Sequence, residues 1–138
     1  MYLNKLLIIL LLSSSVVFAN AIIITNKNFK DTLTINDVKS IFLGKKTRLS
    51  DQTLLYPAYL ETLDESTLSF FTQVIKKPYR KFNKYWIKRV FSGHGVPPKR
   101  LKNIGQLLKY VSENKGAIAI VSNKVKLDGD IKVLPLSW

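Results

Sequence analysis

The 138-residue sequence contains no cysteine and a single histidine. The absence of cysteine excludes a disulfide framework, a thiol nucleophile, a thiolate metal site and a lipid-modified cysteine anchor. The one histidine, His94, cannot build a His-rich metal site by itself. Glycine and proline are also scarce, at six and five residues against 46% apolar residues, which excludes a disordered, collagen-like or low-complexity chain. We therefore expect one globular domain that holds no metal and no other cofactor.

Acidic residues are scarce as well, with nine Asp and Glu against 22 Lys and Arg, for a formal net charge of +13. Such an excess points to anionic partners or surfaces. The 18 lysines outnumber the four arginines and are spread along the chain, and no recognisable nucleic-acid module is present. We interpret the charge as a solvated basic surface with some affinity for anionic lipid or cell wall, and we expect no nucleic-acid partner.

The first residues have the pattern of a secretory signal peptide. Lys5 precedes an unbroken apolar run over Leu6–Leu12, and small residues precede the two candidate cleavage points, after Ala19 and after Ala21. The alternative is an uncleaved membrane anchor, but an apolar stretch of about 12 residues is shorter than the roughly 20 that span a bilayer. We therefore predict a signal peptide over residues 1–21, cleaved after 19 or 21. The exported domain over residues 22–138 is then periplasmic and does not span the membrane.

Apolar runs that are rich in β-branched residues predict buried strands over residues 21–25, 53–60, 116–122 and 131–136. Pro57 places the second of these strands at an edge or a bend. A helix begins at Thr34, whose side chain and that of Asp37 predict a capping box, and Gly44 ends it. Strands that alternate with helices favour a single α/β layered domain.

Three more helices follow from apolar residues at three- and four-residue spacing. The first opens at Leu63–Ser66, the second runs from Pro78 to about Phe91, and the third begins at Asn103, where Gln106 completes a possible capping box. The first of these helices is expected to carry Leu68, Phe71, Val74 and Ile75 on one side. Trp86, on the second, is expected to be buried and to anchor its helix together with Phe82.

No catalytic constellation is present. His94 lies between two glycines without a nearby carboxylate, and Asp128 and Asp130 flank Gly129 as in an ordinary Asp-Gly turn rather than a cation loop. The sequence also lacks a glycine-rich phosphate loop. We therefore predict a protein that is not an enzyme. An aromatic set at helical spacing is interpreted as core rather than as a stacking platform: Phe70, Phe71, Phe82, Tyr85, Trp86 and Phe91.

Several segments in order carry a resemblance to a known family: Ile41–Lys45, Tyr85–Trp86, Phe91–Pro98 and Gly116–Ile118. Together they resemble the short, single-domain proteins named phosphate transporter substrate-binding proteins, which are similar to one lobe of the two-lobed phosphate-binding protein. The resemblance covers nearly all of the chain after the signal peptide. It implies an α/β fold that is a single lobe of the type II periplasmic binding protein, with a mixed sheet of four to five strands flanked by helices.

The resemblance also implies an oxyanion site at the start of the helix that follows the second predicted strand. There, free backbone N–H groups and hydroxyl donors hold an anion that the helix dipole favours. Two-lobed relatives have Arg, then Asp two residues later, then Gly-Ser-Gly-Thr in this stretch, and the matching residues here are Leu60, Thr62 and Leu63–Ser66. Asp64 and Glu65 would neutralise the helix start and repel phosphate by about 1 kcal/mol or more each. Ser66 and Thr67 are the donors that this sequence keeps.

Two function hypotheses follow. The first is an exported, non-enzymatic module that resembles phosphate-binding proteins and binds a small oxyanion weakly near Ser66 and Thr67. The alternative is an interaction or accessory module of a periplasmic sensor or envelope complex, which has lost its ligand and docks on a periplasmic or membrane protein. The acidic helix start favours the alternative, while the basic turn at Lys45–Arg48 suits either.

Overall fold

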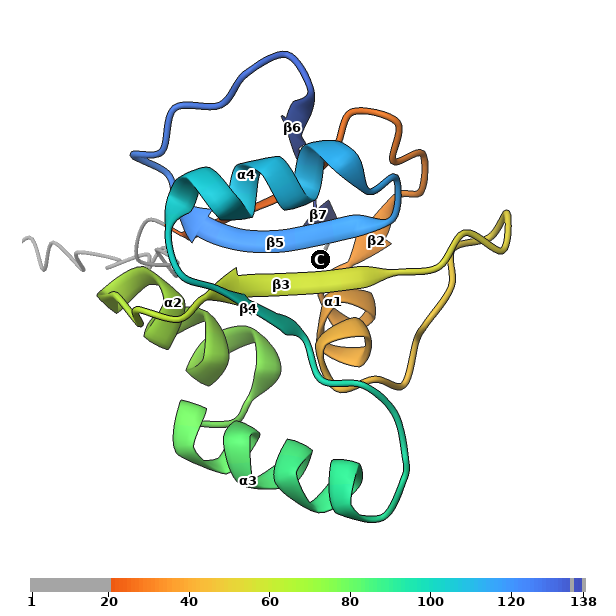
Figure 1. Ribbon diagram of the computed structural model, residues 1–138, viewed down its shortest axis with the longest axis vertical. Helices are drawn as coiled ribbons and strands as arrows, with labels where there is room; N and C mark the ends of the chain where they lie inside the picture. The colour runs from red at the N-terminus through yellow and green to blue at the C-terminus, as the bar shows by residue number, and fades with distance from the viewer. Residues whose placement is uncertain (1–20, 135, 138) are drawn as a thin grey trace, which may run out of the picture.

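A computed structural model describes residues 21–134, 136 and 137 (Figure 1). The predicted signal peptide lies outside the described residues except for Ala21, which begins the first strand. Five strands form the main sheet in the order β4-β3-β5-β1-β6, and two form a short parallel pair, β2 with β7. The strands are β1 (Ala21–Asn26), β2 (Leu33–Thr34), β3 (Tyr56–Leu60), β4 (Lys99–Leu101), β5 (Ala117–Ser122), β6 (Ile131–Val133) and β7 (Leu136–Ser137). The helices are α1 (Ile35–Phe42), α2 (Glu65–Phe70), the π-helical turn η1 (Phe71–Ile75), α3 (Tyr79–Phe91) and α4 (Ile104–Glu113).

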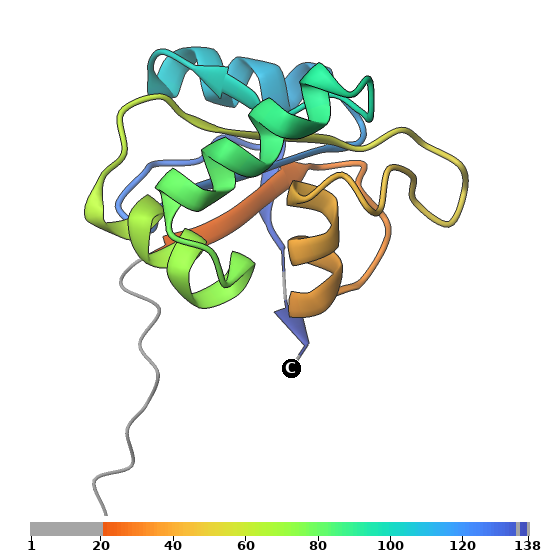
Figure 2. The same ribbon diagram turned by 90° about the horizontal axis from the view of Figure 1, so that it is seen from below.

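The main sheet is mixed and is covered on both faces. β3 runs parallel to β4 and β5, whereas β1 runs antiparallel to β5 and β6. Helices α1 and α2 with the turn η1 pack on one face, α4 packs on the other, and α3 lies outermost beyond α1 and η1 (Figure 2). All of β5 from Ala117 to Val121 is fully buried, because its alternate side chains enter the two different cores. Burial on both faces explains why this strand is an unbroken apolar run.

Two hydrophobic cores lie on the two faces of the main sheet. Among the described residues, the larger core gathers side chains from β1, α1, η1, α3 and β5, and the smaller one lies between the sheet and α4. The predicted α/β fold, with a mixed sheet of four to five strands flanked by helices, is confirmed.

The start of α1 has the predicted capping box. The Thr34 hydroxyl accepts a hydrogen bond from the Asp37 N–H at 3.1 Å, and the Asp37 carboxylate accepts one from the Thr34 N–H at 2.9 Å. These bonds supply partners for backbone N–H groups that the first helical turn leaves without one. They also hold the pKa of Asp37 below its ordinary value, chiefly through the backbone hydrogen bond from Thr34.

The end of α1 is held by side chains of α3. The Trp86 indole N–H donates to the Phe42 carbonyl at 3.0 Å, and the Tyr85 hydroxyl donates to the Leu43 carbonyl at 2.6 Å. Gly44 has φ +70, and a Cβ there would lie 2.6 Å from the Trp86 ring. This position therefore needs glycine for both its backbone angle and its lack of a side chain. Trp86 is 4% exposed, which confirms its predicted burial.

Of the two expectations for the second predicted strand, β3, an edge or a bend, the structure excludes the edge. This strand lies inside the sheet between β4 and β5. Proline is tolerated because the pairing with β4 begins one residue later, at Ala58 with Lys99, so the missing N–H of Pro57 falls where β4 has not begun. β4 itself was not predicted, because it has three residues of which Lys99 and Arg100 are charged.

Two apolar residues that were expected in the core are exposed. Leu68 is 43% exposed, because the buried stripe of α2 and η1 runs through Thr67, Phe70 and Phe71, and Leu68 falls beside it. Phe91 is 90% exposed. It is the last residue of α3 and follows Trp86 by five positions, which turns it to the opposite side of the helix. The rest of the aromatic set is buried or half-buried, as expected of core residues.

Candidate functional site

The start of α2, where the sequence predicts an anion site, lies at one edge of the main sheet. β3 ends at Leu60 and α2 begins at Glu65, while β4 ends at Leu101 and α4 begins at Ile104. Because β3, β4 and β5 are parallel, their carboxyl ends share this edge, on the left in Figure 1. Ligands of open α/β sheets bind at such edges.

Asp64 is the N-cap of α2 and occupies the helix start itself. Its carboxylate oxygen Oδ1 accepts a hydrogen bond from the Thr67 N–H at 2.8 Å, and its backbone carbonyl accepts one from the Leu68 N–H at 3.0 Å. Both Asp64 and Glu65 are exposed. An anion that approaches this helix start therefore meets two carboxylates, and the N–H of Thr67 already has a partner.

The two predicted hydroxyl donors lie together in the first turn of α2. Ser66 is 8% exposed and Thr67 is 1% exposed, so both side chains are buried where α2 packs against the sheet. Their neighbours in sequence, Asp64 and Glu65, face the solvent in their place. The first turn thus offers negative charge to the solvent and keeps its hydroxyl residues inside.

Three solved structures resemble this arrangement of strands and helices. An ABC-type phosphate transport receptor from Vibrio cholerae is 13% identical, with a TM-score of 0.54. The match covers 85% of this chain and 46% of the receptor chain. A protein named as a phosphate ABC transporter substrate-binding protein, from Clostridium perfringens and solved with bound phosphate, is 19% identical with a TM-score of 0.62. A protein named as phosphate-binding, from Planctomyces limnophilus, is 15% identical with a TM-score of 0.56.

The fold is one lobe of a phosphate-binding protein. The likeness covers 85–86% of this chain but 41–46% of those chains, so the chain spans less than half their length. At identities below 20% the likeness shows the fold alone. No family model and no curated protein matches the sequence. The resemblance stated from the sequence is confirmed at the level of fold.

The lobe has a second helix start at the same edge of the sheet, and it is capped by a neutral side chain. The Asn103 side chain accepts a hydrogen bond from the Gln106 N–H at 2.9 Å. The Gln106 side chain accepts from the Lys102 N–H at 3.3 Å instead of the Asn103 N–H, so half of the expected capping box is present. Both helix starts at this edge are therefore closed by the chain's own side chains.

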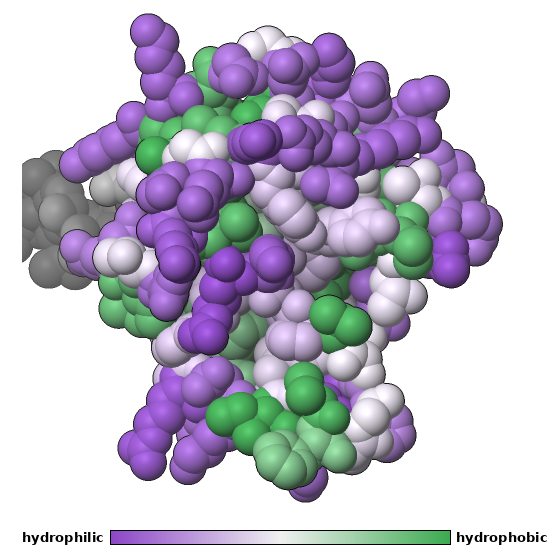
Figure 3. All heavy atoms as spheres, in the orientation of Figure 1, coloured by the Kyte–Doolittle hydropathy of each residue, from purple (hydrophilic) through white to green (hydrophobic). Residues whose placement is uncertain are grey.

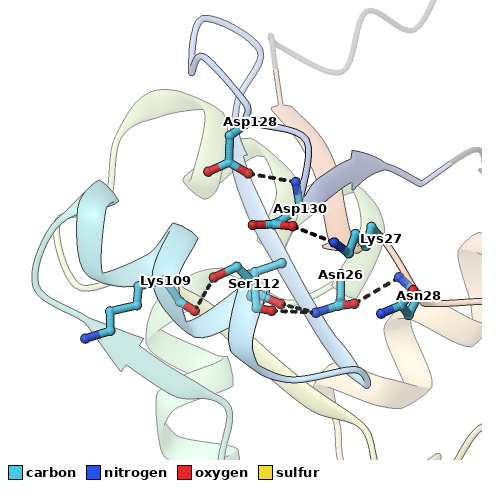
Figure 4. A network of polar contacts seen from close by, with 8 residues as sticks. Asn26, Lys27, Asn28, Lys109, Ser112, Asp128 and Asp130 are labelled. Atoms are coloured by element: carbon cyan, nitrogen blue, oxygen red, sulfur yellow. Dashed lines mark hydrogen bonds and ion pairs between the residues drawn. The ribbon is translucent and has the colours of Figure 1, made fainter.

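The remaining polar candidates of the lobe take structural roles. His94 is exposed, with its Nδ1 2.9 Å from the Ser92 hydroxyl. The Asp130 N–H donates to the Asp128 carboxylate at 2.9 Å, and the Asp130 carboxylate pairs with Lys27 at 2.7 Å (Figure 4). These contacts agree with a plain Asp-Gly turn. Among the described residues, no group of three or more His, Asp and Glu could hold a metal ion.

Asn26 is a buried polar residue that the sequence reasoning missed. Its amide nitrogen donates to the carbonyls of Val111 and Ser112, both at 2.9 Å, and its carbonyl oxygen accepts from the Asn28 N–H (Figure 4). The bonds supply partners for carbonyls in the last turn of α4 and tie that helix to the end of β1. The sequence feature that could have indicated this role is an asparagine at the end of an apolar, β-branched run.

The net charge of the lobe is concentrated in one part of the chain. Residues 66–112 contain eleven of the 22 lysines and arginines and none of the nine acidic residues. The rest of the chain holds the other eleven basic residues and all nine acidic ones. The lysines are spread along the sequence as described above, but the acidic residues are not. The positive field therefore centres on α3 and its flanking segments. Among the described residues, no helix is long and apolar enough to cross a membrane.

Proposed function

We propose that this chain is an exported, non-enzymatic module of the solute-binding type, which binds phosphate weakly or not at all at neutral pH. The observation that carries the proposal is the hydrogen bond from the Thr67 N–H to the Asp64 carboxylate, at the place where the family resemblance puts the anion. Ser66 and Thr67 are the donors that a weakly bound oxyanion would use. Of their donor groups, the Thr67 backbone N–H becomes available when the Asp64 carboxylate is displaced, whereas both side chains are buried against the sheet.

Calorimetric titration with phosphate, and separately with sulfate, tests this proposal. The unmodified protein is expected to bind at millimolar levels or not at all. The double variant Asp64→Ala/Glu65→Gly removes the side-chain acceptor of the Thr67 N–H and two negative charges, so its affinity for phosphate should rise about tenfold or more. Micromolar phosphate binding by the unmodified protein would overturn the proposal.

The matched control for this titration is Glu113→Gln/Asp128→Asn. It removes the same two charges at exposed positions outside α2. We expect it to leave phosphate affinity within about twofold of the parent, because charges that far from the helix start are screened. An equal gain in both double variants would mean that net charge, and not the freed helix start, controls binding.

Export through the predicted signal peptide is the second part of the proposal. Cleavage after Ala19 leaves the whole of β1, whereas cleavage after Ala21 removes the strand's first residue, which pairs with Ser122. Intact mass of the protein from the periplasm decides between the two sites. A periplasmic chain that retains residues 6–12 would contradict cleavage.

The alternative, a module that docks on a periplasmic or membrane protein, is favoured by the acidic start of α2, where Asp64 and Glu65 are exposed and the Thr67 N–H already has a partner. Such a partner would face the start of α2. A photoreactive residue at Glu65 should crosslink to that partner in the periplasm, whereas one at Lys124 should not.

A further inference from the structure

One end of the molecule combines unpaired cations with exposed apolar side chains. Ten lysines and arginines lie between Lys76 and Lys102, in a stretch with no acidic residue. The ion pairs among the described residues involve Lys27, Lys46, Lys109 and Lys115, and none of these ten. Every one of the ten therefore lacks a carboxylate partner within the described fold.

The apolar side chains of this end project outward. Phe91 is 90% exposed and Val96, in the loop after α3, is 85% exposed. Ile87 and Val90 on α3 are each about half exposed. Figure 3 shows green, apolar side chains at the end of the molecule formed by α3, with purple, hydrophilic ones beside them. Ile87, Val90 and Phe91 line one pocket and lie at three- and four-residue spacing on α3, so these three exposed apolar residues are grouped and not scattered singly, which is typical of a contact surface.

The exposed cluster continues inward as a cavity. It has a volume of about 230 Å³ and lies between α3 and the segment that leads into β4. Phe82 and Trp86 line it from the core side, and Arg100 lines it beside Pro98. A phosphate group held next to the apolar cluster would meet the Arg100 guanidinium there.

We propose that α3 and the loop after it, with Phe91 and Val96 at their tip, dock on the surface of an anionic lipid bilayer. An amphipathic helix binds such a surface when its apolar side chains enter the head-group region and its lysines meet lipid phosphates. The exposed residues Lys84 and Lys88 lie on the same helix as the apolar cluster. The protein binds as a peripheral module and does not cross the bilayer.

Two observations favour lipid over an acidic protein partner. First, the apolar side chains protrude, and a fluid interface accepts protruding groups without a shaped pocket. Second, residues 66–112 contain eight lysines and three arginines. Lysine interacts as a mobile point charge, whereas the planar arginine fork suits fixed carboxylates. A fluid layer of phosphate groups needs no fixed geometry.

Vesicle co-sedimentation of the exported protein, purified from the periplasm, tests the proposal. Vesicles of equal parts phosphatidylglycerol and phosphatidylcholine should bind the protein at least about tenfold more tightly than pure phosphatidylcholine vesicles, with the difference shrinking at high salt. Equal binding to the two vesicle types would overturn the proposal.

Apolar variants locate the surface. Phe91→Ser/Val96→Ser should weaken binding to the phosphatidylglycerol vesicles about tenfold or more, since two side chains no longer enter the interface. The control Leu68→Ser/Val133→Ser changes two exposed apolar residues elsewhere, which are 43% and 48% exposed. It should stay within about twofold of the parent.

Charge variants complete the test. Lys84→Gln/Lys88→Gln should weaken binding about tenfold or more, whereas Lys124→Gln/Lys126→Gln, with the same charge change, should have an effect below about threefold. Equal losses in both pairs would show a response to net charge alone and would overturn the location. Failure of the folded parent to bind phosphatidylglycerol vesicles while it binds polyglutamate would assign the surface to an acidic protein partner instead.

Discussion

The start of α2 and the exposed side of α3 differ in whether their charged side chains have partners within the protein. At the start of α2, the Asp64 carboxylate accepts a hydrogen bond from the Thr67 N–H, so this N–H is already paired when an anion approaches. At the end of α3, Lys84 and Lys88 have no ion pair among the described residues, and Phe91 is exposed to solvent. The difference shows that a side chain of the protein itself closes a helix start at the carboxyl edge of the sheet, while unpaired cations and exposed apolar side chains lie on α3.

The largest expected effect comes from breaking the attachment of α3. Trp86→Ala removes a buried ring and the hydrogen bond to the Phe42 carbonyl, and should lower the free energy of unfolding by about 3–5 kcal/mol in urea titrations. Phe91→Ala, on the same helix, should change it by less than about 0.5 kcal/mol because the ring is exposed. Similar losses for the two variants would contradict the division of α3 into an anchored and an open face.

A smaller effect is expected where the chain closes its own helix start. Asp64→Ala leaves the Thr67 N–H without its side-chain acceptor and should lower the free energy of unfolding by about 1 kcal/mol. Glu65→Ala is the control, because Glu65 places a charge near the helix start but is not the N-cap. It should lower the free energy of unfolding by roughly a few tenths of a kcal/mol. If Asp64→Ala costs no more than its control in thermal or urea melts, the cap does not stabilise α2.

The smallest expected effect is on stability at acidic pH, which depends on the carboxyl groups of the chain. Hydrogen bonds from Thr53, helped by Lys115, lower the pKa of Asp51 from 3.8 to about 2. Because the folded-state pKa is the lower one, the stabilisation is fully present above the unfolded-state pKa and is lost as the pH falls through the folded-state value.

Asp51→Asn should therefore flatten the decline of the urea midpoint between about pH 4 and pH 2, with Glu61→Gln as the exposed control. A decline with the same slope in Asp51→Asn and in the parent would show that Asp51 does not contribute to acid unfolding. Residues 66–112 contain no carboxylate side chain that could respond.

Much of the fold was predictable because its signals are local. The capping box of Thr34 and Asp37, the stop at Gly44 and the apolar run of β5 each depend on residues that are close in sequence. Pro57 misled the reasoning because proline is tolerated there only through the position at which β4 begins, Lys99, which is distant in the chain. Phe91 misled it because helical spacing alone does not say where the neighbouring elements end.

That a helix begins beside Asp64 was predictable from the sequence, whereas the burial of its first residues was not. Spacing and resemblance led to Ser66 and Thr67, and the acidic neighbours were visible in the sequence. That both side chains are buried, and that Asp64 and not Glu65 caps the helix, required the packing of α2 against the sheet. Burial depends on contacts with β1 and β5, which are distant in sequence.

The sequence by itself determined the alternation of strands and helices, the helix caps and the excess of positive charge, since each of these is set by residue type and short-range spacing. Tertiary structure decided which side chains face solvent. It placed the Trp86 ring against the end of α1, where only glycine, here Gly44, leaves room for the ring. It also left the apolar tip of α3 without a covering element, because no other described segment packs over Phe91, which keeps 90% of its surface exposed.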